Sequence, residues 1–564
     1  MPRSMMITRG PLLAACLLLA ICAGCSNDDD PAAPCPGTSP WTLDGYLTLR
    51  TQAQVDQCRG LTRVGGSLVI GPSRDITDLS ALAALDSVGG NIAIDHNDSL
   101  ASLAALAHCR WCGSTLEIVG NPRLRSLAGL DSLGSRSPWL SVTIGECAEL
   151  ASLVGLPSRS SIRSLWLQEL PALASLAGLA PRPGLERLGL VDLPAPCGAA
   201  DLPDLPALAE LDLRRLPGLR DLAVVARAPA LERLNVERCD SLANLAGLEG
   251  AGELRYLWLN ALPRLAALGG FGGLHALRSL AIGDCVNLVD FSGLGSPAAL
   301  ESLAIISCPG LLDLSLLPEP ARLQGLSLTD LDGLQSLQGA GPLWELRTLS
   351  IRYCDELRSL SGLPVMPSLV RLRIDANQGL SGLHGLPALD ALETLEVSNC
   401  TALASLAGLP PLPALHGCEF YRLNALGDLA GLSLGDPGLE LVLYHLPALR
   451  TLEHLAGVTA CYSCAISDCD ALASLHGLEG LGTISGRLDL YGNAALADIS
   501  ALAPTAPVVT VVIQDNPGLD QCAALAHVAG WPGVTSLQVS NNGPCAVAFA
   551  TGGPAPRAAA PRAQ

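Results

Sequence analysis

Residues 395–409 read LEVSNCTALASLAGL, and variants of this stretch recur along most of the 564-residue chain. With Val397 as position zero, an aliphatic residue or Phe returns at that position every 23 residues, and the series continues toward both ends with small slips. A fixed period of this length is the signature of a repeat architecture, in which each repeat forms one unit that stacks on the next. The 21 position-zero residues are Ile70, Ile94, Ile118, Ile144, Leu167, Leu190, Leu213, Val236, Leu259, Ile282, Ile305, Leu328, Ile351, Ile374, Val397, Phe420, Leu443, Ile466, Leu490, Ile513 and Val539.

Position +3 of the repeat carries Asn, Cys or Leu, with Ser73 in the first repeat, while Leu recurs at positions +6, +9 and +12. In leucine-rich repeats position +3 lies at the inward-pointing corner after the strand, where Asn can bond the backbone and Cys fits as a small, weakly polar group. We therefore predict structural thiols rather than nucleophiles, because a reactive thiolate needs exposure and a positive neighbour. The predicted ladder comprises Asn97, Asn121, Cys147, Cys239, Cys285, Cys308, Cys354, Asn377, Cys400, Cys469, Asn493, Asn516 and Asn542.

The pattern L-x-[LIV]-x-x-[NC]-x-x-L-x-x-L, as in LEIVGNPRLRSLAGL at residues 116–130, resembles the receptor L-domain type of leucine-rich repeat of bacterial envelope proteins. The resemblance covers residues 42–545. It implies an N-terminal cap over residues 42–66, made of a strand and a short helix, then a solenoid over residues 67–545 with a C-terminal cap from about residue 517. The motif is specific for the fold, but this scaffold serves many binding roles.

The predicted fold is a leucine-rich-repeat solenoid with one long parallel sheet and short, mostly non-helical return segments. Each repeat contributes one strand, so 21 rungs about 4.8 Å apart would form a rod or shallow arc roughly 100 Å long. The return segments are Pro/Gly-rich, as in AGLPPLPAL, which favours loops and single turns. Cys522 and Cys545 bracket the last rung and are predicted to form a disulfide, and Cys35 with Cys58 is a second candidate pair.

The N-terminus predicts export. Arg3 and Arg9 precede an apolar run at residues 12–23 that is too short to span a bilayer as a mature helix. The run ends in CAGC, which resembles the site where bacterial lipoproteins are cut before a lipidated cysteine. We therefore expect a signal peptide at residues 1–24, lipid-anchored Cys25 with a flexible tether at residues 25–41, and a cell-envelope location, at the outer membrane or cell surface. The alternative is an ordinary secretory signal cut nearby. Membrane attachment is expected only through this lipid.

Composition narrows the classes of partner. Apolar residues make up 49% of the chain and aromatic residues only 3%, so the core must be built almost wholly from Leu, Ala, Val and Ile. The chain has no Lys, its 34 basic residues are all Arg, and its net charge is −19. This charge argues against nucleic acid as a partner, because phosphate binding needs basic patches. The Ala/Pro-rich tail at residues 546–564 is expected to be disordered.

The motifs that could form a metal site or a catalytic site do not fit the register of the repeats. The C-x-x-C pairs Cys109/Cys112 and Cys461/Cys464 lie about 15 rungs, or roughly 70 Å, apart, so they cannot share one metal ion, and local disulfides or packed thiols are expected. Gly431-Leu-Ser433-Leu-Gly435 matches a nucleophile elbow but falls in a return loop, not on a strand–turn–helix. We expect no catalytic residue, no metal site and no cofactor.

Positions −3, −1 and +1 point away from the core, because side chains alternate along a strand. These positions hold a third of the aromatic residues, and exposed rings on a sheet suggest contact with a partner. Alternatively, large side chains merely cover the sheet or lean on one another across rungs. The predicted ligand-binding residues are Trp166, Tyr256, Trp258, Arg352, Arg371, Arg373, Glu419, Tyr421 and Tyr444.

The sequence thus predicts a non-enzymatic binding or adhesion scaffold that acts through its long sheet, with a protein or glycan as ligand. A structural spacer of the envelope without a specific ligand is the alternative. An enzymatic function is disfavoured because the repeat register brings no set of candidate catalytic residues together.

Overall fold

The computed structural model describes residues 40–545, except 138, 158–161, 177, 180–181, 195–201, 295–297, 316–321 and 433–438. The predicted signal peptide, Cys25, Cys35, most of the tether, Ser433 and the tail lie outside the described residues. The strands of the main sheet are β2 (Leu47–Leu49), β4 (Leu68–Ile70), β6 (Ile92–Asp95), β7 (Thr115–Val119), β8 (Leu140–Gly145), β9 (Ile162–Gln168), β10 (Arg187–Val191), β11 (Glu210–Arg214), β12 (Arg233–Glu237), β13 (Tyr256–Asn260), β14 (Ser279–Gly283), β15 (Ser302–Ile306), β16 (Gly325–Thr329), β17 (Thr348–Arg352), β18 (Arg371–Asp375), β19 (Thr394–Ser398), β20 (Gly417–Tyr421), β21 (Leu439–Tyr444), β22 (Ala460–Ser467), β23 (Thr483–Tyr491), β24 (Thr510–Gln514) and β25 (Ser536–Ser540).

These strands pair in parallel and in chain order, and each position-zero residue lies opposite its counterpart on the next strand. Val397, for example, lies between Ile374 and Phe420. A bulge shifts the register between β22 and β23, where the repeat is one residue longer than 23, and another interrupts the start of the pairing between β8 and β9, where the period is kept. Among the described residues β2 pairs with β4 at one end and β25 with β24 at the other, so the sheet is open. The leucine-rich-repeat solenoid is confirmed.

Little of the return side is helical, as predicted. Among the described residues the helices are α1 (Gln52–Asp56), α2 (Gln521–Val528) and the 3-10 turns η1 (Ser80–Leu82), η2 (Ala104–His108), η4 (Ala223–Arg227), η5 (Leu248–Gly250), η6 (Phe271–Gly273), η7 (Ser292–Leu294) and η8 (Glu453–Leu455). A small second sheet, which the sequence analysis did not predict, joins β1 (Trp41–Leu43), β3 (Leu61–Val64) and β5 (Ser87–Val88) at the N-terminal end. None of the described helices is long and apolar enough to cross a bilayer.

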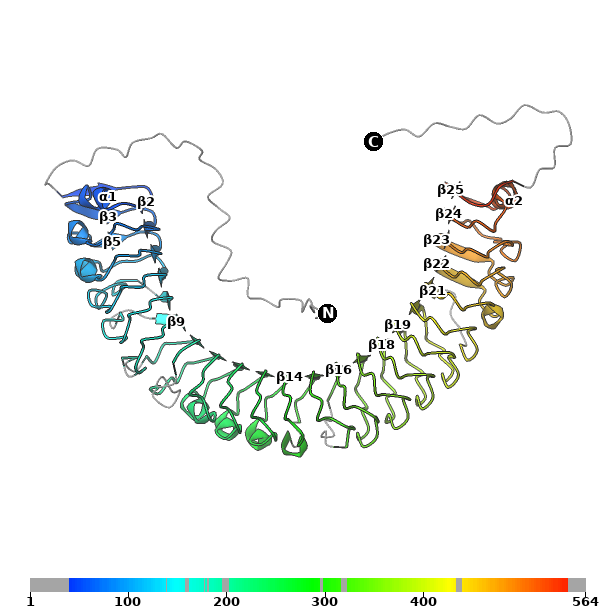
Figure 1. Cartoon of the computed structure of the whole chain (residues 1–564), viewed down its shortest axis with the longest axis horizontal. Coiled ribbons are helices and arrows are strands. Elements are labelled where there is room, and N and C mark those ends of the chain that lie inside the picture. The colour runs from blue at the N-terminus through cyan, green and yellow to red at the C-terminus, as the bar shows by residue number, and fades with distance from the viewer. Residues whose placement is uncertain are drawn as a thin grey trace, which may run out of the picture.

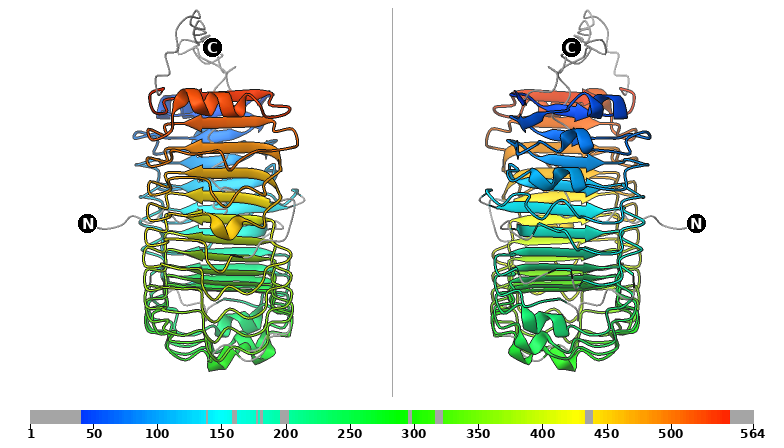
Figure 2. Two further views of the ribbon diagram at one scale, coloured as in Figure 1. Left: turned by 90° about the vertical axis from the view of Figure 1, so that its right-hand side faces the viewer. Right: turned by 90° about the vertical axis from the view of Figure 1, so that its left-hand side faces the viewer.

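The expected rod or shallow arc is wrong, because the solenoid curves into a deep horseshoe (Figure 1). The main sheet lines the inner, concave side and the return segments form the outer side. Hydrogen bonds hold neighbouring strands about 4.8 Å apart, whereas the bulkier outer turns need more room, so the stack bends toward the sheet. Seen from the side, the strands lie as parallel, nearly level rungs (Figure 2). The strand side chains that point away from the core therefore face the inside of the horseshoe.

A left-handed corner ends almost every strand. The residue at position +2 has a positive φ in repeat after repeat, and Asn399 is typical with φ 56°. A left-handed conformation costs a residue other than Gly about 1 kcal/mol or more. The corner breaks the strand alternation and turns position +3 inward, where Cys400 and Asn377 are fully buried. The gain from that burial and its hydrogen bonds offsets the repeated backbone cost.

At position +3 of the repeat, the Asn side chains bridge neighbouring rungs. Asn493 Nδ2 donates to the carbonyl of Ile466 on the preceding rung at 2.8 Å, and Asn493 Oδ1 accepts from Cys469 N at 2.9 Å. Cys reproduces part of this pattern, since Cys400 Sγ lies 3.3 Å from the carbonyl of Ser398. Burial raises the pKa of Cys400 to about 11, so its thiol is protonated at neutral pH. This geometry supports a structural role for the ladder cysteines.

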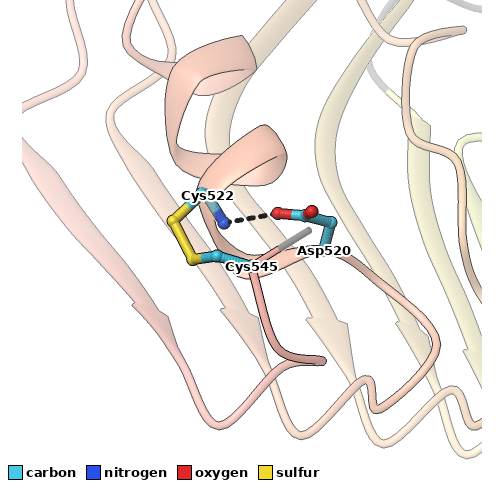
Figure 3. Close-up of side chains that lie close together, drawn as sticks. All are labelled: Asp520, Cys522 and Cys545. Carbon is cyan, nitrogen blue, oxygen red and sulfur yellow. Dashed lines mark hydrogen bonds between the residues drawn. A yellow bond between two sulfur atoms is a disulfide. The ribbon is translucent and has the colours of Figure 1, made fainter. Parts of the chain in front are cut away.

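Both ends of the stack carry caps. At the N-terminal end α1 is capped by Thr51, whose side chain accepts from Gln54 N. At the C-terminal end Cys522 and Cys545 form a disulfide, and Asp520 accepts a hydrogen bond from Cys522 N at the start of α2 (Figure 3). Terminal repeats have a neighbour on one side only, so such caps protect the exposed end of the core.

Candidate binding surface on the concave sheet

The concave face holds all nine residues predicted to bind a ligand, but it divides them into separate groups. Trp166 lies on β9, Tyr256 and Trp258 lie on β13, and the others lie on β17 to β21. From β13 to β20 is seven rungs, or about 34 Å along the sheet. One small ligand therefore cannot contact every predicted residue.

Trp166 packs within the protein. It pairs in register with Gly189 on β10, and a Cβ added to Gly189 would run into the indole ring. The ring thus lies across the neighbouring rung and is only partly exposed. This arrangement matches the interpretation that large side chains lean on one another across the sheet. Of the predicted ligand-binding residues, Trp166 therefore has the weakest support as a ligand contact.

Tyr256 and Trp258 are the most open rings on this part of the sheet. They stand on the same face of β13 and are 42% and 50% exposed. The guanidinium of Arg233, on β12, lies 4.6 Å from the centre of the Tyr256 ring. On the other side their partners in register are Ser279 and Ala281, which are too small to cover the rings. The exposed part of each ring is therefore available to a partner.

Arg352 and Arg373 converge on Asp375, a carboxylate that the sequence analysis did not single out. Arg352 Nε lies 3.2 Å and Arg373 Nη2 3.6 Å from Asp375 Oδ2. Ser398 Oγ and Asn399 Nδ2 donate to Asp375 Oδ1 at 2.8 and 2.7 Å. Burial alone would raise the pKa of Asp375, but these hydrogen bonds and the two arginines outweigh burial and hold the pKa below its usual range. Asp375 therefore stays charged and fixes both guanidinium groups.

A shallow hollow of about 370 Å³ adjoins this network. Tyr421 and Tyr444 line it from adjacent rungs, with ring centres 6.1 Å apart and planes inclined by 54°. Tyr421 OH donates to Glu419 Oε2 at 3.2 Å. Burial, followed by the charge of Glu419, raises the pKa of Tyr421 to about 12. The full lining is Arg373, Glu396, Ser398, Asn399, Tyr421, Arg422 and Tyr444.

Arg371 differs from the other predicted arginines. It is exposed on β18, two residues before Arg373, and among the described residues it forms no ion pair. Arg373, in contrast, also contacts Glu396 Oε1 at 3.1 Å. An exposed, uncompensated guanidinium can pair with a carboxylate or similar planar anion of a partner.

The surface residues that sequence reasoning missed come from two sources. Asp375, Glu396 and Ser398 lie at outward strand positions, and the repeat register alone could have placed them beside Arg373. Asn399 and Arg422 lie at left-handed corners, where strand alternation does not apply, so only the structure places them at the rim of the hollow. Arg233 could have been found by the register, since it precedes Tyr256 by one rung.

The other reactive groups of the described chain offer little chemistry. Cys109 and Cys112 are buried free thiols, and burial raises their pKa values to about 12 and about 11. Cys461 and Cys464 are likewise buried and free, and burial raises both pKa values. Cys285 and Cys308, expected as separate thiols on successive rungs, are also free. Asp520, Cys522 and Cys545 cluster closely enough to hold a metal, but the two sulfurs are bonded to each other and supply no thiolate.

Comparison with known proteins adds structural neighbours only. No family model and no curated protein matches the sequence. A structure of TLR13 in complex with ssRNA13 shares 14% identity, covering 88% of this chain and 83% of that one, with a TM-score of 0.31. A leucine-rich-repeat protein of Leptospira interrogans shares 15% identity over 68% of this chain and 92% of its own, also with a TM-score of 0.31. At this level of superposition neither likeness adds to the strand register, which by itself defines a leucine-rich-repeat solenoid.

Proposed function

We propose that this protein is an exported, lipid-anchored, non-enzymatic scaffold that binds a protein or glycan ligand on its concave sheet. The observation that carries the proposal is the exposed ring pair of Tyr256 and Trp258 on the inner side of the horseshoe. Rings that remain this open on a solvent-facing sheet contribute nothing to the core, whereas buried aromatic anchors dominate many binding interfaces. The hollow beside Tyr421 and Tyr444 offers a second contact region on the same face.

The scaffold needs little motion to bind. Its strands are held on both sides by neighbouring rungs, so the concave residues keep fixed positions relative to one another, and a pre-organised surface loses less entropy on binding. The thiols of the described ladder are buried, which supports binding rather than nucleophilic chemistry. We also propose that the repeats are of the receptor L-domain type, which their sequence pattern resembles.

Anchoring is proposed through Cys25, because CAGC follows a short apolar run at the N-terminus. Metabolic labelling with palmitate tests the anchor: the wild-type chain should take up label and Cys25→Ala should not. Protease treatment of intact cells then tests the side of the membrane, with a known periplasmic protein as control. Shaving would favour adhesion or receptor work at the surface, whereas protection would direct the search for a partner to the periplasm.

Binding is tested with a variant that removes four rings. Tyr256, Trp258, Tyr421 and Tyr444 are each replaced by Ser, and the labelled full chain is applied to an array of glycans and to immobilised envelope proteins. We expect the variant to fold and to bind at least about tenfold more weakly, since ring anchors commonly contribute 2 kcal/mol or more. Tyr491→Ser is the matched control, because Tyr491 is a concave ring with 45% exposure on β23, two rungs beyond Tyr444 and outside the lining of the hollow. Unchanged binding of the fourfold variant to every retained ligand would contradict the proposal.

A structural spacer is the second candidate, and the contacts across rungs favour it. Trp166 covers Gly189, Arg233 stacks on Tyr256, and Tyr421 lies against Tyr444. If these pairs exist only to stabilise the sheet, the fourfold variant should lower the melting temperature and leave every binding signal intact. The two candidates therefore predict opposite results for stability and for binding.

A further inference from the structure

The concave sheet has a floor between β13 and β17 that carries no acidic side chain. The fifteen outward positions of these five strands hold small or hydroxyl residues, apart from Tyr256, Trp258 and Asn260 on β13, Ile306 on β15 and Arg352 on β17. The chain as a whole is strongly acidic, with 53 Asp and Glu against 34 Arg. The floor residues are Tyr256, Trp258, Asn260, Ser279, Ala281, Gly283, Ser302, Ala304, Ile306, Gly325, Ser327, Thr329, Thr348, Ser350 and Arg352.

Two arginines bracket this floor in one row. Arg233 on β12 and Arg371 on β18 both occupy position −3, both are exposed, and neither forms an ion pair among the described residues. Other concave arginines are compensated: Arg187 pairs with Glu210 and Arg487 with Asp489. Arginines without an ion pair among the described residues therefore lie at both ends of five strands whose outward positions hold no carboxylate, and acids on these rungs such as Asp284 and Asp330 lie beyond them at the left-handed corners. This distribution of charge complements an anionic partner.

We propose that the ligand of the concave sheet is an acidic polysaccharide that lies along the solenoid axis across β12 to β18. The inference rests on the proposed binding function and specifies its ligand. A sugar ring stacks on the exposed parts of Tyr256 and Trp258, hydroxyl groups meet the Ser and Thr side chains of the floor, and carboxylates pair with Arg233 and Arg371. Six strand spacings separate Arg233 on β12 from Arg371 on β18, a span of about 29 Å, so the ligand is an extended chain.

A polysaccharide fits this floor better than a peptide does. An extended peptide gains affinity by adding a strand to a sheet edge, but every floor strand already has a neighbour on both sides. A helical peptide needs an apolar groove, and Ile306 is the only aliphatic side chain larger than Ala that the floor presents. Hydroxyl side chains repeat about once per rung and can both donate to and accept from sugar hydroxyls. Two free arginines are also too few for a nucleic-acid backbone.

The first experiment measures binding of the full chain to four acidic polysaccharides: polygalacturonate, alginate, hyaluronan and heparin. Dextran and methyl-esterified polygalacturonate are the neutral controls, and poly-L-glutamate is the peptide control. We expect at least one acidic polysaccharide to bind, more weakly as salt rises, because the exposed ion pairs are screened. If none of the four binds better than the neutral polymers, the acidic-polysaccharide proposal is wrong.

Variants then locate the bound chain. Ala304→Glu places a carboxylate in the middle of the floor and should abolish binding, whereas Ala465→Glu makes the same change at the same strand position on β22 and should not. Arg371→Gln should weaken binding about tenfold, the worth of one charge-assisted pair, and Arg487→Gln should leave it unchanged. Melting temperatures confirm that each variant folds. Binding that survives Ala304→Glu in a folded protein overturns the location.

The outcomes separate this inference from the proposed function. Suppose that poly-L-glutamate or a neutral glycan binds, and that this binding is lost with Trp258→Ser but not with Arg371→Gln. The proposed binding function would then stand, and the acidic polysaccharide would be rejected as the ligand. If every concave variant keeps binding every ligand as well as the wild type does, both the proposed binding function and the acidic polysaccharide are rejected.

Discussion

The C-terminal rungs and the middle rungs fill the same inward corner in different ways. Toward the C-terminus Asn493, Asn516 and Asn542 form an unbroken amide ladder, in which each side chain bonds the next at 3.0–3.1 Å. In the middle the position is occupied by Cys or Leu, and Asn377 is an isolated amide between Cys354 and Cys400. A middle rung has neighbours on both sides, whereas the last strand, β25, pairs only with β24, and its residues stay exposed or half-buried. The comparison suggests that hydrogen bonds across rungs matter most where stacking is weakest.

The largest effect on the C-terminal amide ladder is expected for Asn516→Leu. Leu is native at this position in Leu423 and Leu446, so its shape suits the corner. The change would nevertheless leave Leu490 O without the amide donor it now has at 3.0 Å, and Asn493 N without its acceptor at 2.9 Å. Because several buried polar groups lose partners together, we expect the free energy of unfolding to fall by about 3 kcal/mol.

Urea unfolding followed by circular dichroism gives the size of this loss. Hydrogen exchange at Asn493 N–H shows whether the loss is local, since that proton should exchange faster in the variant. Leu446→Ala, which only removes packing in a middle rung, serves as the contrast and should leave Asn493 N–H protected. Normal protection of Asn493 N–H in Asn516→Leu would mean that the amide ladder does not hold the C-terminal rungs.

A smaller effect is expected for Asn377→Cys, which gives one rung the residue of its neighbours. Asn377 Nδ2 donates to Ile351 O at 2.9 Å, and Asn377 Oδ1 accepts from Cys354 N at 2.9 Å. A thiol can replace the donor weakly but not the acceptor at this distance, so we expect a loss of about 1–2 kcal/mol. Exchange at Cys354 N–H measures the lost acceptor. A loss as large as that of Asn516→Leu would contradict the idea that middle rungs depend mainly on packing.

Much of the fold could be predicted because the repeat determines it locally. One register places Val397 inward, Glu396 outward and Cys400 at the corner, and repetition removes the ambiguity that a single short apolar run would have. The deep curvature could not be read from the same pattern, since it depends on the difference in width between the strands and the outer turns. The second sheet at β1, β3 and β5 was missed because its strands are short and lack the repeat signal.

The binding surface was only partly predictable for a related reason. Outward positions could be assigned from alternation, which correctly places Tyr256, Arg373 and Tyr421 on one face. Whether a side chain is free or engaged depends on rotamers and on neighbours one rung away. The sequence therefore could not tell the engaged Arg373 from the uncompensated Arg371, nor show that Trp166 lies over Gly189.

The smallest expected effect, and the sharpest test of the corner itself, is Cys400→Asn. The introduced amide can donate to Ile374 O and accept from Asn377 N, the geometry that Asn121 already has with Ile94 O at 2.7 Å and with Asn97 N at 3.2 Å. We expect the variant to fold with a free energy of unfolding within about 1 kcal/mol of the wild type, because new hydrogen bonds offset the loss of an apolar sulfur. Cys400→Ala, which can form no such bonds and leaves a small void, should cost about 1 kcal/mol. If Cys400→Asn unfolds the protein while Cys400→Ala does not, the corners of the middle rungs cannot accommodate an amide. The Cys and Leu residues of the middle rungs would then reflect this incompatibility, rather than a weaker need for hydrogen bonds than at the C-terminal rungs.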